Sequence, residues 1–174
     1  MVSWPYRPDF LGEGNPPLEV PSTSADRIAL MKQLSSSWAD PFRSLVQSIP
    51  ADAESTVINL QDWVPHRNMS RDSRVTLAGD AGHTMVMYRG EGANHALKDV
   101  SSLLHHLHPH LSPYSPSSPT VPSAIGAYES EMFGRSRLAV LASRQACLDA
   151  HEYARISEES PLISKRAVVP DYQA

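Results

Sequence analysis

A carboxylate and three glycines fall close together in the middle of this 174-residue sequence. Asp80 follows Gly79 at the end of an apolar stretch, and Gly90-Glu91-Gly92 directly precedes a helical pattern. A carboxylate accepts hydrogen bonds, so it suits a ligand with hydroxyl groups better than a phosphate. Glycines leave backbone amides open to a flat or anionic ligand, and a helix N-terminus directs unpaired N–H groups to the same place. The segment could therefore bind a ligand that combines a hydroxylated chain with an electron-rich ring edge.

A simpler interpretation of the same residues remains open. Glycines before a helix are common, and a short motif of this kind carries a large risk of a false match. In this interpretation the segment is a tight strand–helix turn and Asp80 is only a capping residue. Spacing alone favours the simpler interpretation.

Helices are expected on both sides of this segment. After an irregular, proline-rich start, the capping residues Ser22-Thr23-Ser24 predict a helix N-terminus. Ile28, Met31, Leu34 and Trp38 follow on one apolar face. Pro41 is expected to open a second short helix.

Two strands are expected next, at residues 56–60 and 74–78, because both segments are rich in β-branched residues. The second runs directly into Gly79-Asp80. The pattern then becomes helical from Ala93 to His108. Its apolar face consists of Ala93, Ala96, Leu97, Val100, Leu103, Leu104 and Leu107. A proline- and serine-rich linker follows, and a last long helix is expected from about Ser123 to Ile156.

Composition sets limits on the class of protein. A net charge of −4 without a basic stretch gives no electrostatic basis for nucleic-acid binding. No apolar run is long enough to span a bilayer, so no membrane span is expected. The single cysteine, Cys147, suits a reducing compartment, and the N-terminus does not resemble a secretion signal. We therefore expect a cytoplasmic protein.

The central residues also carry a family resemblance. Residues 77–83, Leu-Ala-Gly-Asp-Ala-Gly-His, followed by Gly90-Glu91-Gly92-Ala93-Asn94 and Asp99, resemble the second flavin-binding motif of the group A FAD-dependent monooxygenases. These are the salicylate- and para-hydroxybenzoate-hydroxylase-like enzymes, many of them fungal. Residues 62–63, 128–132 and 143–146 fit the same pattern. The sequence is similar to the C-terminal part of such an enzyme.

The resemblance implies a cofactor and its contacts. Asp80 would bind the ribityl hydroxyls of FAD. The backbone at Gly90, Gly92, Ala93 and Asn94 would hold the pyrimidine edge of the flavin ring. Enzymes of the family use NAD(P)H as co-substrate and O₂ to hydroxylate a small molecule, usually aromatic, here an aromatic or related secondary metabolite. The resemblance assigns no catalytic residue.

The sequence departs from the family pattern in three respects. Gly82 stands where alanine is usual, and Thr84 replaces a frequent proline. No Gly-x-Gly-x-x-Gly segment follows a first strand, so we expect a second polypeptide to supply the dinucleotide-binding half. The alternative function is a catalytically inactive truncated remnant, or a partner subunit that retains the fold without turnover.

The expected fold is α/β: a partial FAD-binding monooxygenase fold with a few strands, a flavin-facing helix and a long C-terminal helix. Residues 1–55 would be a remnant of a substrate domain with connecting helices, and residues 56–110 the second half of the FAD-binding domain. Residues 111–122 would be the linker, and residues 123–174 the C-terminal helical segment.

Other candidate residues favour structural roles. His106 and His110, four residues apart, could ligate zinc, but Pro109 disturbs the helix between them and no further ligand is near, so no metal site is predicted. His95 and Asp99 could form a polar pair, although a solvated helix face is the favoured interpretation. Cys147 is expected to be an inert thiol.

Overall fold

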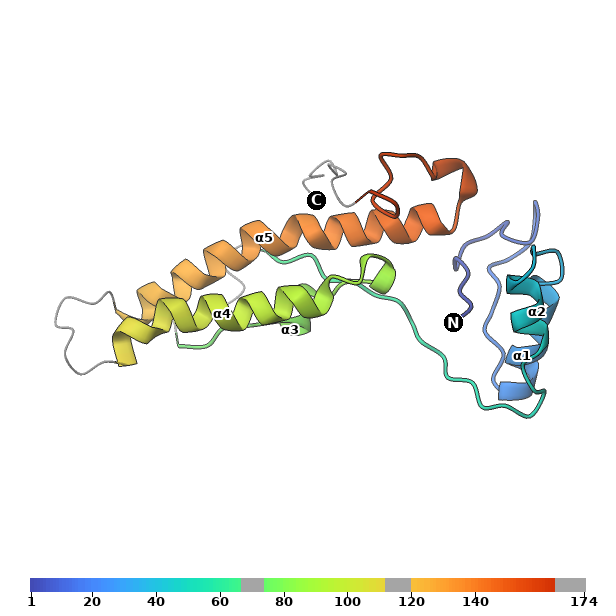
Figure 1. Ribbon diagram of the computed structural model, residues 1–174, viewed down its shortest axis with the longest axis horizontal. Coiled ribbons are helices and arrows are strands. Elements are labelled where there is room, and N and C mark those ends of the chain that lie inside the picture. Colours follow the sequence, from blue (N-terminus) through green and yellow to red (C-terminus); the bar gives the residue numbers. More distant parts are fainter. Residues whose placement is uncertain (67–73, 112–119, 165–174) are drawn as a thin grey trace. The chain divides into compact units, whose positions relative to one another are not determined.

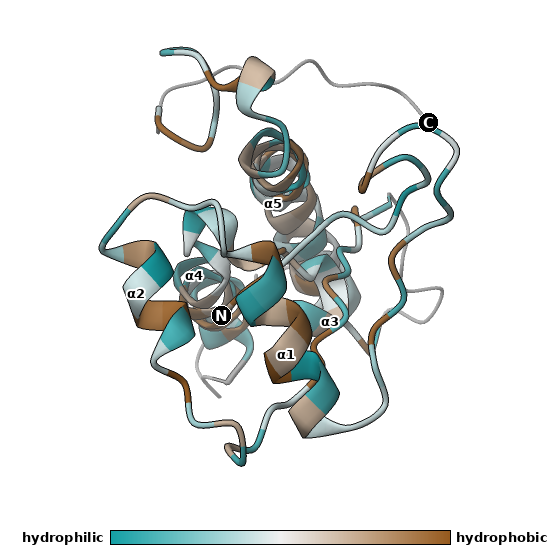
Figure 2. Cartoon of the chain, turned by 90° about the vertical axis from the view of Figure 1, so that its right-hand side faces the viewer, coloured by the Kyte–Doolittle hydropathy of each residue, from teal (hydrophilic) through white to brown (hydrophobic). Residues whose placement is uncertain are grey.

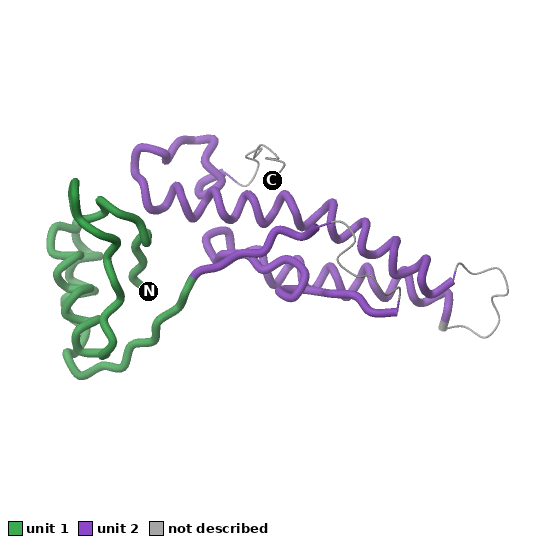
Figure 3. Tube along the Cα trace, turned by 180° about the vertical axis from the view of Figure 1, so that it is seen from behind, with its two compact units in different colours: residues 1–59 green, residues 60–174 purple. Residues whose placement is uncertain are grey.

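The computed structural model describes residues 1–66, 74–111 and 120–164. The chain divides into two compact units, residues 1–59 and residues 60–174, coloured separately in Figure 3. Each unit is described by itself.

The first unit contains the short helices α1, Ser24–Leu34, and α2, Phe42–Gln47. The Thr23 hydroxyl caps α1 by accepting a hydrogen bond from the Asp26 N–H at 3.1 Å. Ile28 and Val46 are the buried apolar residues of these two helices, which carry both hydrophobic and hydrophilic residues (Figure 2). The two helices confirm the predicted start near Ser24 and the short helix after Pro41. Trp38, placed by prediction on the face of the first helix, lies beyond its end and is 39% exposed.

Arg27 connects the segment before α1 with the segment after α2. Its guanidinium donates to the carbonyl oxygens of Pro21 and Ser55, both at 2.9 Å, and to the Ser55 hydroxyl at 2.8 Å. A planar guanidinium has five N–H donors in a fixed geometry, so it can hold two chain segments at once. Arg27 thereby fixes the segments that enter and leave the helical pair.

The second unit is built on two long helices that run antiparallel and side by side, α4, Gly92–Leu111, and α5, Val121–Ala150 (Figure 1). Short helices complete it: α3, Asp80–His83, and the 3₁₀ helices η1, Met87–Arg89, and η2, Tyr153–Arg155. The core follows one stripe of α5, as its 3.6-residue period requires. Its buried apolar residues are Ala124, Ile125, Tyr128, Met132, Val140, Leu141, Ala142 and Ala146.

The expected strands at residues 56–60 and 74–78 do not form, and no residue in the described ranges belongs to a strand. The expected long helices form, but the described residues hold none of the strands of the expected α/β fold. β-branched residues favour an extended backbone, yet a strand exists only where a neighbouring strand pairs with its N–H and C=O groups. Single hydrogen bonds serve here instead, such as that from the Trp63 N–H to the Thr84 carbonyl at 3.0 Å.

The helices also differ in detail from the prediction. α4 continues past His108 to Leu111, with Pro109 inside it, while α5 ends at Ala150 rather than Ile156. Thr120 caps α5, which begins before Pro122, and residues 112–119 of the expected linker lie outside the described residues. The predicted apolar face of α4 is only partly buried. Leu97, Val100 and Leu104 are all more than half exposed, because the side of α4 facing α5 carries polar residues.

None of the described helices is long and apolar enough to cross a membrane.

Tyr128 offers a direct test of how α5 holds the segment before Gly79. Its side chain is fully buried, and its hydroxyl donates to the Leu77 carbonyl at 2.9 Å. Burial, with the nearby Asp99 carboxylate, raises the pKa of Tyr128 to about 12, so the hydroxyl remains a donor at neutral pH. Tyr128→Phe leaves that carbonyl without this donor and should lower the free energy of unfolding by about 0.5–1.5 kcal/mol in urea denaturation.

Tyr153→Phe is the matched control, since Tyr153 is 90% exposed. It should leave stability unchanged within about 0.5 kcal/mol. Equal losses in the two variants would contradict the role assigned to the Tyr128 hydroxyl.

Candidate functional site

The turn from Gly79 to His83 presents Asp80 to solvent. Gly79 has φ 57°, a left-handed conformation that L side chains rarely adopt, and a Cβ there would lie 3.3 Å from the Ala96 Cβ. The Gly79 carbonyl accepts from the Gly82 N–H at 2.9 Å and the His83 N–H at 3.0 Å. The chain therefore turns sharply against the second turn of α4. Asp80 is the first residue of α3, and its side chain is exposed.

The second predicted segment, Gly90 to Asn94, contains the start of α4. Gly90 is left-handed, with φ 64°, and ends η1, while Gly92 is the first residue of α4. A Cβ added at Gly90 or Gly92 would meet no atom within 4 Å, and Ala93 and Asn94 are exposed. The backbone at the N-terminus of a 20-residue helix is thus open to a ligand, and its amide dipoles favour negative charge there.

Arg89 holds this segment in place. Its guanidinium pairs with Glu91 at 3.0 and 3.1 Å and donates to the carbonyl oxygens of Pro161, at 2.7 Å, and Ser164, at 3.2 Å. The Arg89 side chain is only 8% exposed. The glycine-containing loop is therefore fixed to the turn that follows η2.

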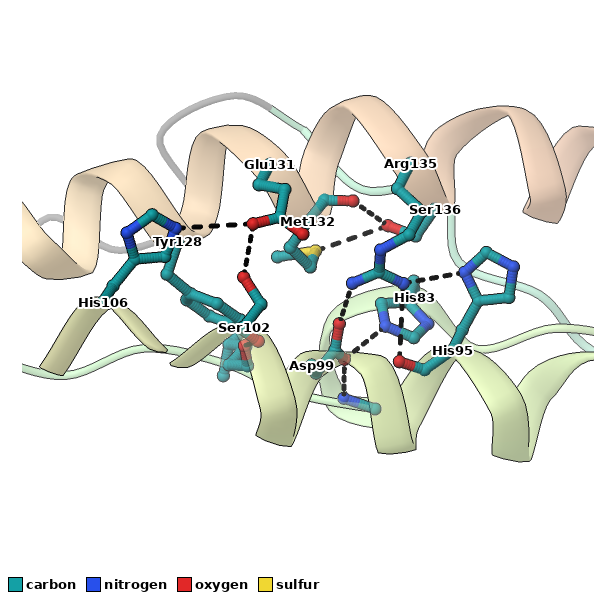
Figure 4. Close-up of polar contacts among 12 residues, drawn as sticks. His83, His95, Asp99, Ser102, His106, Tyr128, Glu131, Met132, Arg135 and Ser136 are labelled. Atoms are coloured by element: carbon teal, nitrogen blue, oxygen red, sulfur yellow. Dashed lines mark hydrogen bonds and ion pairs between the residues drawn. The ribbon is translucent and has the colours of Figure 1, made fainter. Parts of the chain in front are cut away.

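A buried polar cluster lies between α3, α4 and α5 (Figure 4). At its centre, Asp99 is fully buried and receives three donors. Its Oδ2 accepts from the Gly79 N–H at 2.7 Å and from His83 Nε2 at 2.6 Å, and its Oδ1 accepts from Arg135 Nη2 at 2.5 Å. An ionised carboxylate only accepts, so the His83 tautomer in this arrangement carries its proton on Nε2.

The charges in the cluster are matched. Burial alone would raise the pKa of Asp99, but the Gly79 N–H, Arg135 and His83 outweigh it and lower that pKa below its usual value. Asp99 is therefore ionised at neutral pH. A carboxylate that accepts several hydrogen bonds and faces a guanidinium is stabilised in its charged form.

Arg135 also reaches the first turns of α4. Its Nη1 donates to His95 Nδ1 at 2.9 Å and to the His95 carbonyl at 3.4 Å. Because a guanidinium cannot accept, His95 Nδ1 must be unprotonated in this arrangement. Burial, and then the charge of Arg135, lower the pKa of His95.

The expectation that His95 and Asp99 lie on a solvated helix face is wrong. The two residues share Arg135 of α5 as a partner, and Asp99 has no exposed surface. Arg135 is the residue that sequence reasoning missed. The sequence signals of this cluster were the positions of His83 and Asp99 in the family motif and the four-residue spacing of His95 and Asp99.

The other candidates have structural partners. His106 lies 3.4 Å from a Glu131 oxygen that also accepts from the Ser102 hydroxyl at 2.6 Å. Within the described ranges, no group of three or more histidine, cysteine, aspartate or glutamate residues could hold a metal ion. Burial raises the pKa of the Cys147 thiol, which agrees with an inert cysteine.

Comparison with known proteins assigns part of the sequence to a family. Residues 42–118 match the FAD binding domain family, and this range contains Asp80 and the segment from Gly90 to Asn94. No solved structure matches the chain.

Three fungal relatives extend the assignment. The chain is 46% identical to a probable FAD-dependent monooxygenase of Arthroderma benhamiae, over 98% of this chain and 40% of that protein. It is 39% identical to the FAD-dependent monooxygenase tazP of Aspergillus terreus, over 59% of this chain and 26% of the relative. It is 35% identical to phnB of Penicillium herquei, also an FAD-dependent monooxygenase, over 84% of this chain and 34% of the relative.

Residues 42–118 thus belong to the FAD binding domain family, and the chain is related to the FAD-dependent monooxygenases. The chain spans about 40% of the length of the Arthroderma protein and less of the other two.

The His95–Arg135 contact predicts how stability depends on pH. The pKa of His95 in the folded chain lies below the unfolded value of about 6.5, so between these two values the unfolded chain binds more protons. Stability from this residue is present above about pH 6.5 and is lost as the pH falls through the folded pKa. Urea denaturation at about pH 8 and about pH 5 should show a larger loss for the wild type than for His95→Gln.

Glutamine is a suitable replacement because its amide oxygen can accept from Arg135 without titrating. Equal pH dependence in the two proteins would contradict the contact.

Proposed function

We propose that this chain forms the ribityl- and pyrimidine-binding part of the FAD site of a flavin-dependent monooxygenase. The observation that carries the proposal is the placement of an exposed carboxylate, Asp80, beside the open N-terminus of α4. Gly79 lies against Ala96, one helical turn from Gly92, so the Asp80 turn and the first turn of α4 are neighbours.

The residues fit the two chemical parts of the cofactor. Asp80 accepts hydrogen bonds, as the ribityl hydroxyls require. A Cβ at Gly90 or Gly92 would meet no atom within 4 Å, and Ala93 and Asn94 are exposed, so a flat ring edge can approach the backbone there. When bound, FAD supplies the redox chemistry, while the protein orients it and tunes its surroundings.

The N-terminus of α4 contributes electrostatics. Its N–H groups and macrodipole favour negative charge at the pyrimidine edge, where charge develops when a flavin is reduced. The Asp99 carboxylate is paired with Arg135 beneath this site, so its charge is compensated locally.

The reaction we propose is hydroxylation of an aromatic or related small metabolite with NAD(P)H and O₂. Support comes from the relatives, which are named FAD-dependent monooxygenases and are fungal. In this proposal residues 1–55 belong to a substrate domain, and residues 56–110 form the second half of the FAD-binding domain. The linker, residues 111–122, leads to a supporting helical segment, residues 123–174. The protein would act in the cytoplasm, a compartment that its single cysteine suits. The alternative is a chain that keeps the fold but does not turn over.

Reconstitution with FAD tests the site. The purified 174-residue chain, mixed with FAD and freed of excess by gel filtration, should retain flavin absorbance in the visible range. Asp80→Ala removes the acceptor for the ribityl hydroxyls and should lower flavin affinity by about tenfold or more, since hydrogen bonds to a charged group contribute about 1.5–3 kcal/mol.

His106→Ala is the control, because His106 of α4 contacts Glu131 of α5 and has no assigned flavin contact. It should leave flavin retention unchanged. Equal losses in the two variants would contradict the assignment of Asp80, and a wild-type chain that retains no flavin would contradict binding by this chain.

A further inference from the structure

Asp99 holds the turn around Asp80 at two points. Its Oδ2 accepts from the Gly79 N–H at 2.7 Å and from His83 Nε2 at 2.6 Å. These contacts lie one residue before Asp80 and three residues after it. The backbone of Asp80 is therefore fixed on both sides by a single buried carboxylate.

Arg135 connects the same carboxylate to the start of α4. Its guanidinium lies between Asp99 and His95, with Nη2 on Asp99 at 2.5 Å and Nη1 on His95 Nδ1 at 2.9 Å (Figure 4). His95 directly follows Asn94, the last residue of the segment assigned to the pyrimidine edge. One guanidinium of α5 thus contacts both the carboxylate that holds the Asp80 turn and the residue that follows the pyrimidine-edge segment.

We propose that Asp99 and Arg135 are positioning residues that hold Asp80 and the first turn of α4 at the spacing that one flavin molecule requires. This inference rests on the proposed function. Asp99 has no exposed surface to offer a ligand, so it acts through Asp80. The pair sets where the ribityl contact lies relative to the ring contact.

Asp99→Asn changes the hydrogen bonds that position the Asp80 turn while it nearly keeps the shape of the side chain. Asparagine has nearly the shape of aspartate, but it replaces one acceptor oxygen with an NH₂ donor, and all three partners of Asp99 are donors. At least one contact to the Asp80 turn or to Arg135 is lost. The turn then relaxes, while the core of α5 is unchanged.

Riboflavin and lumiflavin are the probes that report the position of Asp80. Both carry the isoalloxazine ring, but only riboflavin has ribityl hydroxyls, so the ratio of their dissociation constants reports the contact made by Asp80. Titration of the full chain, followed by flavin fluorescence, should show that Asp80→Asn reduces the preference for riboflavin by about tenfold. Asp99→Asn should reduce it by about three- to tenfold, with lumiflavin affinity nearly unchanged.

The double variant Asp80→Asn/Asp99→Asn tests the route of action. If Asp99 acts through Asp80, the double variant loses no more preference than Asp80→Asn alone. Losses that add would overturn the inference, because Asp99 would then act independently of Asp80.

Asp149→Asn controls for a merely structural effect. Asp149 is also a buried aspartate of this unit, 2% exposed, and it accepts from Gln145 at 2.6 Å and from the Ser160 hydroxyl. Its replacement should lower stability in urea but leave the riboflavin preference intact. An equal loss of preference in this control would overturn the inference, because general destabilisation would then explain the effect.

Arg135→Lys keeps the test decisive if Asp99→Asn does not fold. Lysine keeps the charge but lacks the fork that reaches Asp99 and His95 together, so the riboflavin preference should fall about threefold or more. The positioning role alone would be overturned by one result. In that result Asp80→Asn loses the riboflavin preference, while folded Asp99→Asn or Arg135→Lys proteins keep it in full. An Asp80→Asn protein with full preference would overturn the proposed site as well.

Discussion

The ion pair between Asp99 and Arg135 is the interaction on which the second unit depends. A carboxylate as fully buried as Asp99 is costly unless its charge is paired and its oxygens accept hydrogen bonds. Both conditions are met, because the Gly79 N–H, His83 and Arg135 all donate to it. Apolar stripes tolerate some sliding of one helix along another. A buried pair of this geometry fixes the register of α4 against α5, since loss of either partner would leave the other charge unpaired.

The same constraint explains Gly79. Gly79 must bring its N–H to Asp99 and its Cα close to Ala96, which requires a positive φ and leaves little room for a Cβ. Gly90 has a positive φ for a different reason, because it ends η1 before α4 begins. The loop there is held by Arg89, which reaches Pro161 and Ser164. Both segments are anchored through their flanking residues, so the residues assigned to the flavin are left free of internal packing.

Local patterns made the helices predictable, and long-range contacts made the rest unpredictable. Caps and a 3.6-residue period predict α1, α4 and α5 to within a few residues, because both are properties of neighbouring residues. The strand prediction failed because pairing depends on a partner segment elsewhere in the chain. The burial of Asp99 was missed for a similar reason. Helical spacing places Asp99 near His95, but nothing in it indicates Arg135, which is 36 residues away. The family motif was the one route to Asp80, since the spacing of Gly90 and Gly92 alone did not distinguish a ligand site from a tight turn.

The contacts that hold Asp80 and the start of α4 affect how the proposed site would bind flavin. Asp80 and the N–H groups of α4 are held by contacts within the protein, because Asp99, Arg135 and Arg89 fix the neighbouring backbone. Binding then carries little cost for ordering these segments, and the affinity of this part of the site is limited by the number of contacts it offers. Those contacts are a few hydrogen bonds at the ribityl chain and the ring edge, each of modest net strength in water. The few contacts that retain the flavin here also orient it, and contacts to the adenosine and pyrophosphate parts of FAD would add to the affinity.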